Sequence, residues 1–465
     1  MIMFTPETYK NRRNKLREIM SQGGIVLFPG NNEVPFNYAA NAYAFRQDST
    51  FLYYFGLREP DLAVVLDLDD GSECLFGNDL TIDDIIWTGR QPAMSDKAAS
   101  AAIDRTLSLS ALSDHIRKAR QQGRAIHYLP PYRAETKIQL FDLLEIHPDQ
   151  QKEKASEELI RAVVKMRLAK EPQEIEQIEQ ACETAYKMHT YIMKHARAGI
   201  IEQELAGAIE GIALSNGGPV SFPVILSVNG QTLHNHYHGN TMQNGRLLLT
   251  DAGAENRMNY VSDITRTIPV SGKFDQRQKD IYNIVLSANM KVIEYGSPLR
   301  SYADLHLMAV SEIVTGLKQL NIMKGNAEDA IAKGAHALFF PHGLGHAMGL
   351  DVHDMENLGE NYVGYDASVS RSSQFGLAFL RFARKLEPGF VVTDEPGIYF
   401  IPDLIDQWAA EKKHADYINY DKLTQYRNFG GIRIEDDILI TESGCRVLGR
   451  PIPKTVDEIE RMREF

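Results

Sequence analysis

Residues 342–354 read HGLGHAMGLDVHD, which places His342, His346 and His353 within twelve positions. The chain of 465 residues has only 14 histidines, so this density is unusual for a segment that serves packing alone. A single buried histidine is commonly satisfied by a backbone carbonyl, but this alternative weakens for three together. The intervening glycines suit a backbone that turns closely around a small ion, and imidazole binds borderline metals. We therefore interpret the segment as part of a metal site.

Two aspartates bracket a second segment, DAGAENRMNYVSD, at residues 251–263. Its extended ends and the loop centred on residues 256–259 predict a hairpin in which the carboxylates of Asp251 and Asp263 face each other. Two acids at this spacing are unremarkable by themselves, because turn-capping and solvated aspartates are common. The pair gains significance only together with other candidate ligands.

Two glutamates lie in otherwise apolar, strand-like runs: Glu395 in VVTDEPGIYF and Glu435 in GGIRIEDDILI. A buried carboxylate needs a partner. A neighbouring base, such as Arg433 for Glu435, is one candidate partner. A metal ion is the better one when all the candidate ligands are considered together.

The candidate metal site therefore combines four carboxylates and one imidazole. Such a set offers mainly oxygen ligands that can bridge, which favours Mn or Co over a structural zinc cage. We expect two divalent metal ions, with Mn favoured and Co or Zn as alternatives. A metal pair would activate a water and polarise a carbonyl, as amide hydrolysis requires. The expected metal ligands are Asp251, Asp263, His346, Glu395 and Glu435.

The pattern along the chain predicts an α/β protein of two domains. Residues 1–160 mix strand-like runs, such as GIVLF (24–28) and LAVVLDL (62–68), with polar helical stretches. A charged, helix-rich texture begins near residue 157, and Pro172 suits the first turn of a new helix. We place the boundary there, so that residues 161–465 form a C-terminal catalytic domain that carries all the candidate ligands.

Composition argues against several classes of partner and location. The net charge of −12 and pI of about 5.7 come with interspersed acids and bases, so we expect no nucleic acid partner. Cys74, Cys182 and Cys445 lack the spacing of a disulfide framework or zinc knuckle, which favours a reducing cytoplasm. No apolar run is long enough to span a bilayer, so we expect no membrane association.

The ordered motifs resemble the pita-bread metallopeptidases, in the branch that holds aminopeptidase P and prolidase. The resemblance covers roughly residues 165–450, and AFRQDSTFLYYFGLREPD (44–61) is similar to the amino-terminal domain of these enzymes. It implies a C-terminal pita-bread domain with a curved, mainly antiparallel sheet flanked by helices, and a homodimer. The motifs in order are DAG (251–253), SDITRT (262–267), HGLGH (342–346), DVHD (351–354), EPGIYF (395–400) and GGIRIEDD (430–437).

The resemblance also implies how the metal ligands divide. Asp251 and Glu435 would help to hold one ion, and His346 and Glu395 the other. Asp263 and Glu435 would bridge the two, and Glu395 would also carry the proton of the attacking water.

Further roles come from the same resemblance. His353 would steady the negative charge that develops on the scissile carbonyl oxygen, and His342 would line the proline pocket. Arg433 is a further expected substrate-binding residue. In TLHNHYHGN (232–240), the histidine that contacts substrate matches His234, with His236 and His238 as close competitors.

The stretch LRFARKLEPGF (380–390), with the long insertion before NFGGIRIEDD, is more similar to prolidases than to aminopeptidase P. Arg381 matches the arginine that binds a dipeptide carboxylate, and a guanidinium fork pairs well with that group. We therefore predict an Xaa-Pro dipeptidase. A surface ion pair for Arg381, an aminopeptidase acting on longer Xaa-Pro peptides, a hydrolase of small nonpeptide amides and a non-catalytic binding protein remain alternatives.

Overall fold

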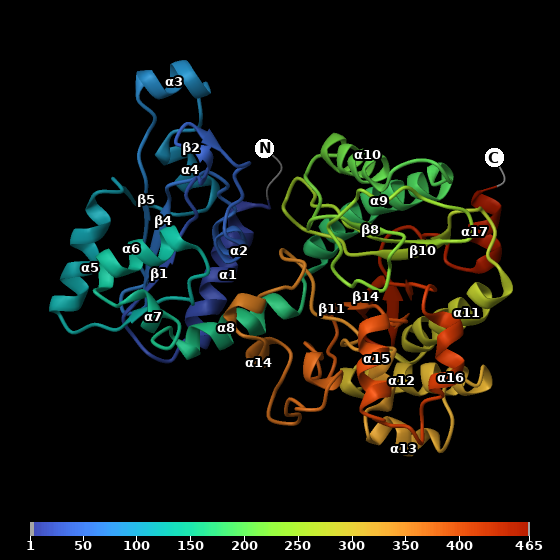
Figure 1. The fold of residues 1–465 in the computed structure, drawn as a ribbon. Coiled ribbons are helices and arrows are strands. Elements are labelled where there is room, and N and C mark those ends of the chain that lie inside the picture. Colours follow the sequence, from blue (N-terminus) through green and yellow to red (C-terminus); the bar gives the residue numbers. More distant parts are fainter. Residues whose placement is uncertain (1–3, 464–465) are drawn as a thin grey trace. The chain divides into compact units, whose positions relative to one another are not determined.

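The structure, a computed structural model, describes residues 4–463 and divides the chain into two compact units (Figure 1). The amino-terminal unit contains residues up to 167 together with 357–362. The catalytic unit, as we call the second one, contains residues 168–356 and those from 363 onward.

The amino-terminal unit is built on a five-stranded sheet with the order β6-β5-β4-β1-β7. The central strands β1 and β4 are antiparallel, whereas the edge strands β6 and β7 run parallel to their neighbours. The nearly uniform apolar sequences of β1 and β4 fit strands that are covered on both faces. The strands are β1 (Ile25–Pro29), β4 (Ala63–Asp67), β5 (Glu73–Phe76), β6 (Thr106–Leu107) and β7 (Ile126–His127).

Helices and one hairpin complete this unit. The hairpin joins β2 (Pro35–Tyr38) to β3 (Asn41–Ala42). Helix α3 (Ile82–Thr88) projects at the top of the unit in Figure 1 and has no buried residue. The other helices are α1 (Pro6–Ile19), α2 (Ser49–Phe55), α4 (Met94–Ser100), α5 (Ala111–Gln121), α6 (Ala134–Leu144), α7 (Pro148–Gln151) and α8 (Glu157–Leu168). Short α14 (Glu360–Val363) and the 3-10 turn η2 (Glu356–Leu358) start or end where the chain passes between the units.

The catalytic unit contains antiparallel strands throughout. One sheet has the order β10-β9-β8 and a second has the order β11-β14-β15, while β12 pairs with β13. The predicted hairpin is present, because β9 and β10 pair with Asp251 opposite Thr265. The strands are β8 (Ile225–Ser227), β9 (Leu247–Asp251), β10 (Thr265–Pro269), β11 (Val391–Asp394), β12 (Gly397–Tyr399), β13 (Gly431–Arg433), β14 (Asp436–Ile440) and β15 (Cys445–Val447).

Helices flank these strands, and the two longest neighbouring pairs are α9 with α10 and α11 with α12 (Figure 1). Helix α9 begins with Pro172 in its first turn, as predicted, and Ile178, Cys182, Ala185 and Ile192 are buried. The helices are α9 (Pro172–His195), α10 (Glu202–Ser215), α11 (Gln276–Tyr295), α12 (Tyr302–Gln319), α13 (Ala327–Ala332), α15 (Pro402–Ala410), α16 (Tyr420–Leu423) and α17 (Val456–Met462). Short 3-10 turns are η1 (Ala335–Leu338), η3 (Leu377–Phe379) and η4 (Thr424–Tyr426).

Two antiparallel ladders succeed one another along the same pair of chain segments. Strands β11 and β14 pair up to Asp394 opposite Asp436, and β12 and β13 resume with Gly397 opposite Arg433. The intervening residues 395–396 and 434–435 lie outside both ladders. This interrupted ladder, as we call it, places Glu395 and Glu435 where the regular alternation of side chains is broken.

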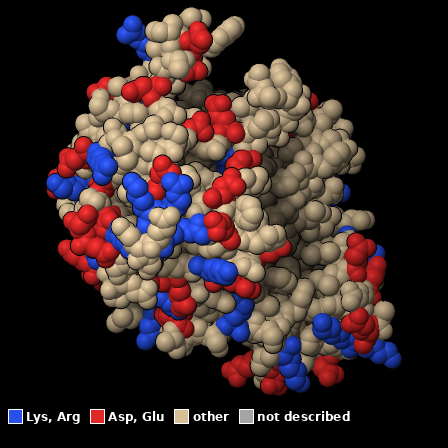
Figure 2. Space-filling model, turned by 90° about the vertical axis from the view of Figure 1, so that its left-hand side faces the viewer, with Lys and Arg blue, Asp and Glu red and all other residues tan. Residues whose placement is uncertain are grey.

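The observed architecture confirms the predicted mixed α/β fold with mainly antiparallel strands in the catalytic unit. Figure 2 shows acidic and basic side chains intermixed over one face of the molecule. None of the helices in residues 4–463 has the length and hydropathy required to cross a membrane.

Candidate active site

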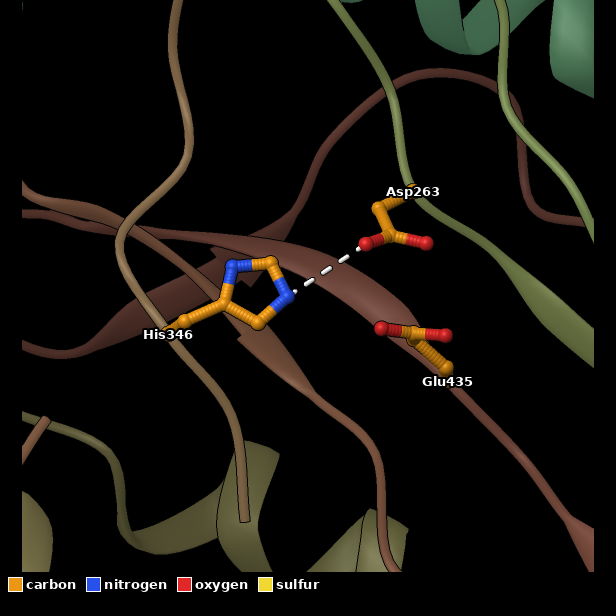
Figure 3. Close-up of side chains that lie close together, drawn as sticks. All are labelled: Asp263, His346 and Glu435. Carbon is orange, nitrogen blue, oxygen red and sulfur yellow. Dashed lines mark ion pairs between the residues drawn. The ribbon is translucent and has the colours of Figure 1, made fainter. Parts of the chain in front are cut away.

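Three of the five expected metal ligands converge in the catalytic unit (Figure 3). Single ligand atoms of Asp263, His346 and Glu435 all lie within 4.8 Å of one another, and all three residues are buried. The Nε2 atom of His346 lies 3.4 Å from Oδ2 of Asp263. Asp263 precedes β10, His346 comes from the glycine-rich segment, and Glu435 comes from the interrupted ladder, so the cluster depends on the tertiary fold.

The glycine-rich segment brings His346 to this position by running close beside β11. His346 N donates to Thr393 Oγ1 over 3.1 Å, and Thr393 N donates to His346 O over 3.0 Å. A Cβ atom on Gly345 would lie 2.3 Å from the carbonyl oxygen of Thr393. Glycine is therefore required at position 345 for the close approach of the two backbones.

The remaining two expected ligands lie at the rim of this cluster. Oε1 of Glu395 is 3.9 Å from His346 Nε2, and its other oxygen is 3.7 Å from His342 Nδ1. Asp251 ends β9 and forms an ion pair with Arg433, with Oδ2 and Nη2 2.6 Å apart. The main chain of Glu395 is also fixed, since its N donates to Leu344 O over 2.9 Å.

Burial and mutual repulsion perturb these carboxylates strongly. Desolvation, reinforced by Glu435 and Asp251, raises the pKa of Asp263 well above its ordinary value. Desolvation and the charge of Glu395 do the same to the pKa of Glu435. Desolvation raises the pKa of Glu395 to about 8. The site therefore brings together carboxylates whose ionised forms repel one another, and a cation would offset that repulsion.

Two oxygens in this group also point to a cation. Asp251 Oδ1 and Asp263 Oδ1 are buried without a hydrogen-bond partner among the described residues. A buried carboxylate oxygen without a donor is costly, and a divalent ion satisfies several such oxygens at once. Desolvation lowers the pKa of His346 well below its usual value, which leaves the neutral imidazole that binds metals. The residues present therefore fit a divalent metal site.

Arg433 connects Asp251 to Tyr399 and Thr265. Its Nη1 donates to Tyr399 Oη over 2.8 Å, and its Nε donates to Thr265 Oγ1 over 3.0 Å. Tyr399 Oη in turn lies 2.9 Å from His342 Nε2. The ion pair of Arg433 is with Asp251, while Glu435, its alternative partner in the sequence, accepts from Thr265 Oγ1 over 2.6 Å.

His353 lies beside His346 and is linked to Arg381 through a shared carboxylate. The rings of His346 and His353 lie with their centroids 4.0 Å apart. Glu356 links the other two residues, since one of its oxygens is bonded to His353 Nδ1 and the other accepts from Arg381 Nη1. Arg381 also acts electrostatically on Glu395, which places its charge beside the candidate metal site.

The loop after β8 carries the three competing histidines. His238 Nδ1 lies 3.0 Å from Leu226 O, and His236 Nδ1 lies 3.5 Å from Val224 O. Desolvation lowers the pKa of His234, and the charge of Arg433 lowers it further. Asp251 and His353 also act electrostatically on His234, so its ring lies within electrostatic reach of the candidate site.

Some residues of the site escaped the sequence analysis. Tyr399 lies in the motif EPGIYF, four residues after Glu395, so the motif could have indicated that Tyr399 belongs to the site. Thr265 likewise comes shortly after Asp263 in SDITRT. Glu356 carries no comparable signal, because only the folded turn brings it between His353 and Arg381.

The chain matches two known protein-family models. The family model described as metallopeptidase family M24 matches residues 176–442, which is more than half of the chain. The chain belongs to metallopeptidase family M24. A second model, described as the aminopeptidase P N-terminal domain, matches residues 9–127 of this metallopeptidase.

Named relatives fall on both sides of the dipeptidase and aminopeptidase division. An "Xaa-Pro dipeptidase" from Homo sapiens is 30% identical over 457 residues, which cover 94% of this chain and 88% of the relative. An "Xaa-Pro aminopeptidase" from Escherichia coli strain K12 is 33% identical over 474 residues, covering 98% and 97%. A solved structure of zinc-substituted E. coli aminopeptidase P in complex with product matches with a TM-score of 0.81 and 32% identity, over 99% of this chain and 98% of that one.

Proposed function

We propose that this metallopeptidase hydrolyses the bond between an amino-terminal residue and proline, and that dipeptides ending in proline are its preferred substrates. The observation that carries the preference is Arg381, whose guanidinium lies close enough to act on Glu395 and His234. A cation at this place would pair with the free carboxylate of a dipeptide. A longer peptide would bring a neutral amide instead.

We assign five residues to two divalent metal ions, with Mn favoured. Support comes from the convergence of Asp263, His346 and Glu435 and from the buried, unpartnered oxygens of Asp251 and Asp263. Glu395 completes the set at the rim. When bound, the ions would supply an activated water and a polarised carbonyl.

The protein side chains would orient the reaction. Glu395 would accept the proton of the attacking water. His353 would donate to the scissile carbonyl oxygen, and His234 would contact the substrate.

His342 would line the proline pocket, where desolvation lowers its pKa to about 3 and so keeps the ring neutral against the apolar proline. Arg433 would act by holding Asp251 and Tyr399 rather than by direct substrate contact.

A second candidate function is the aminopeptidase reaction on longer Xaa-Pro peptides. It is favoured by the match to E. coli aminopeptidase P over nearly the whole chain. The two functions share the metal site and the scissile bond, so they differ only in the group attached to the proline carbonyl. Arg381 is the residue that would meet this group.

We also propose a cytoplasmic homodimer with an amino-terminal domain of residues 1–160 and a catalytic domain of residues 161–465. Three free cysteines are consistent with a reducing compartment. Exposed apolar side chains in the amino-terminal unit suit a contact with a second copy. They are Phe36, Tyr38 and Tyr43 around the β2–β3 hairpin, and Ile82, Ile86 and Trp87 on α3. Sedimentation of the wild type against Trp87→Glu tests this assembly.

A substrate-length series on Mn-reconstituted enzyme tests the function. We expect Ala-Pro to be cleaved with a higher kcat/KM than Ala-Pro-Ala, and Arg381→Ala to raise KM for Ala-Pro while leaving Ala-Pro-Ala nearly unchanged. Better cleavage of the tripeptide by the wild type would favour the aminopeptidase function.

Ligand variants separate the metal site from substrate preference. Asp263→Ala and Glu435→Ala should lose bound metal and hydrolysis of both peptides together. Metal content measured by mass spectrometry provides the check, with Asp403→Ala, the exposed acid in the first turn of α15, as a control. A fully active Asp263→Ala enzyme would contradict the assignment.

A further inference from the structure

The turn after His353 has an unusual backbone. Met355 adopts a left-handed conformation with φ of 62°, although its side chain is buried. A non-glycine residue in this region costs about 1 kcal/mol or more, so the surrounding structure must hold it there. Asp354 provides two such restraints, because its N donates to Ala347 O over 2.8 Å and its carboxylate pairs with buried Lys170.

This turn folds Glu356 back toward the site. Glu356 N donates to His353 O over 3.2 Å, and the side chain then bonds to His353 Nδ1 with one oxygen and to Arg381 Nη1 with the other. The side chains of His353, Glu356 and Arg381 are about one third exposed, at 35%, 33% and 34%. The fixed turn therefore places the carboxylate of Glu356 against the guanidinium of Arg381, which we propose binds the substrate.

We propose that Glu356 is a specificity-determining residue that holds Arg381 in place and offsets its charge. As a result, the enzyme discriminates less between peptides that end at proline and peptides that continue beyond it. The inference rests on the proposed function, in which Arg381 meets the end of the substrate. It assigns to Glu356 a role in substrate choice rather than in bond cleavage.

The two kinds of substrate place different groups opposite Arg381. A longer peptide brings no carboxylate, and a partly desolvated guanidinium without an anion is unfavourable. Glu356 supplies that anion from within the chain. A dipeptide brings a carboxylate that the several N–H groups of a guanidinium can bind, but this carboxylate also meets the negative charge of Glu356. Glu356 therefore favours the longer peptide and penalises the dipeptide.

Matched substrates isolate this effect. Ala-Pro and Ala-Pro amide differ only at the group that would meet Arg381, and kcat/KM is measured for both with Mn-reconstituted enzyme. In Glu356→Gln, which keeps the side-chain shape, we expect the ratio of Ala-Pro to Ala-Pro amide to rise roughly two- to fivefold, mainly through a lower KM for Ala-Pro. Glu356→Asp, which keeps the charge, should stay near the wild-type ratio.

Control variants assign the effect to the pair. In an Arg381→Ala background, Glu356→Gln should change the ratio less, because only the direct repulsion between Glu356 and the dipeptide carboxylate remains. Glu387→Gln removes another acid beside an arginine, 3.8 Å from Arg384, and should leave the ratio unchanged. An unchanged or lower ratio in Glu356→Gln overturns the inference.

A binding measurement keeps the inference separate from the proposed function. If the wild type cleaves neither peptide, the proposed function fails. The calorimetric affinities of the same two peptides then decide about Glu356. A stronger preference of Glu356→Gln for the free carboxylate supports the inference, and the absence of any preference in both proteins overturns it.

Discussion

The metal-free catalytic unit should become less stable as pH rises from about 5 to about 8. Burial raises the pKa of Glu395 from 4.5 to about 8, so the folded chain holds this proton more tightly than the unfolded chain. The free energy of unfolding consequently falls with pH between these two values. The shift sets an upper limit of about 5 kcal/mol for this residue. Asp263 and Glu435, whose pKa values are also raised, act in the same direction.

The two tryptophans make the measurement specific to one unit. Trp408 on α15 is buried, whereas Trp87 on α3 is 86% exposed, so Trp87→Phe leaves a single reporter in the catalytic unit at little cost in stability. Urea denaturation of that variant, without metal, should give a free energy of unfolding that falls by several kcal/mol over this range. Glu395→Gln should remove a large part of the fall.

Excess Mn should reverse the trend. Metal binds the ionised carboxylates, so its stabilisation grows as protons leave the site. A flat or rising free energy of unfolding in the metal-free protein over the same pH range would refute the reasoning, because it would mean that these carboxylates are not buried together.

Three further substitutions test the supporting contacts. Lys170→Met should lower the free energy of unfolding by about 3–5 kcal/mol, since it removes the buried ammonium that pairs with Asp354 over 3.0 Å, and urea denaturation measures this. Arg433→Lys should weaken Mn binding about 10- to 100-fold in calorimetry. The shorter ammonium side chain cannot donate to Asp251 and Tyr399 at the same time, as the guanidinium does. Glu202→Ala should raise KM without changing metal content, since its buried carboxylate accepts from Val228 N over 2.7 Å and so anchors the loop that carries His234.

The cluster of Asp263, His346 and Glu435 was predictable from the sequence, because each residue lies in a local motif whose spacing is visible. The hairpin between Asp251 and Asp263 was predictable for the same reason, since its turn and its strands are adjacent in the chain. Arg433 was one candidate partner for Glu435 in the sequence, whereas in the structure its guanidinium forms an ion pair with Asp251, because proximity in sequence does not fix the direction of a side chain. Glu356 was missed because its position depends on the left-handed backbone of Met355, and composition does not reveal such a conformation.

The interrupted ladder has a consequence for engineering this scaffold. In a continuous ladder, adding or removing one residue exchanges the two faces of a strand from that point onward. Glu395 and Glu435 both lie at the break, between Asp394 opposite Asp436 and Gly397 opposite Arg433. A deletion at 396 would therefore reverse the face of Tyr399 relative to Glu395, and a deletion at 434 would reverse the face of Glu435 relative to Arg433. Residues 391–399 and 431–440 therefore have to be grafted together. Their present pairing register must also be kept.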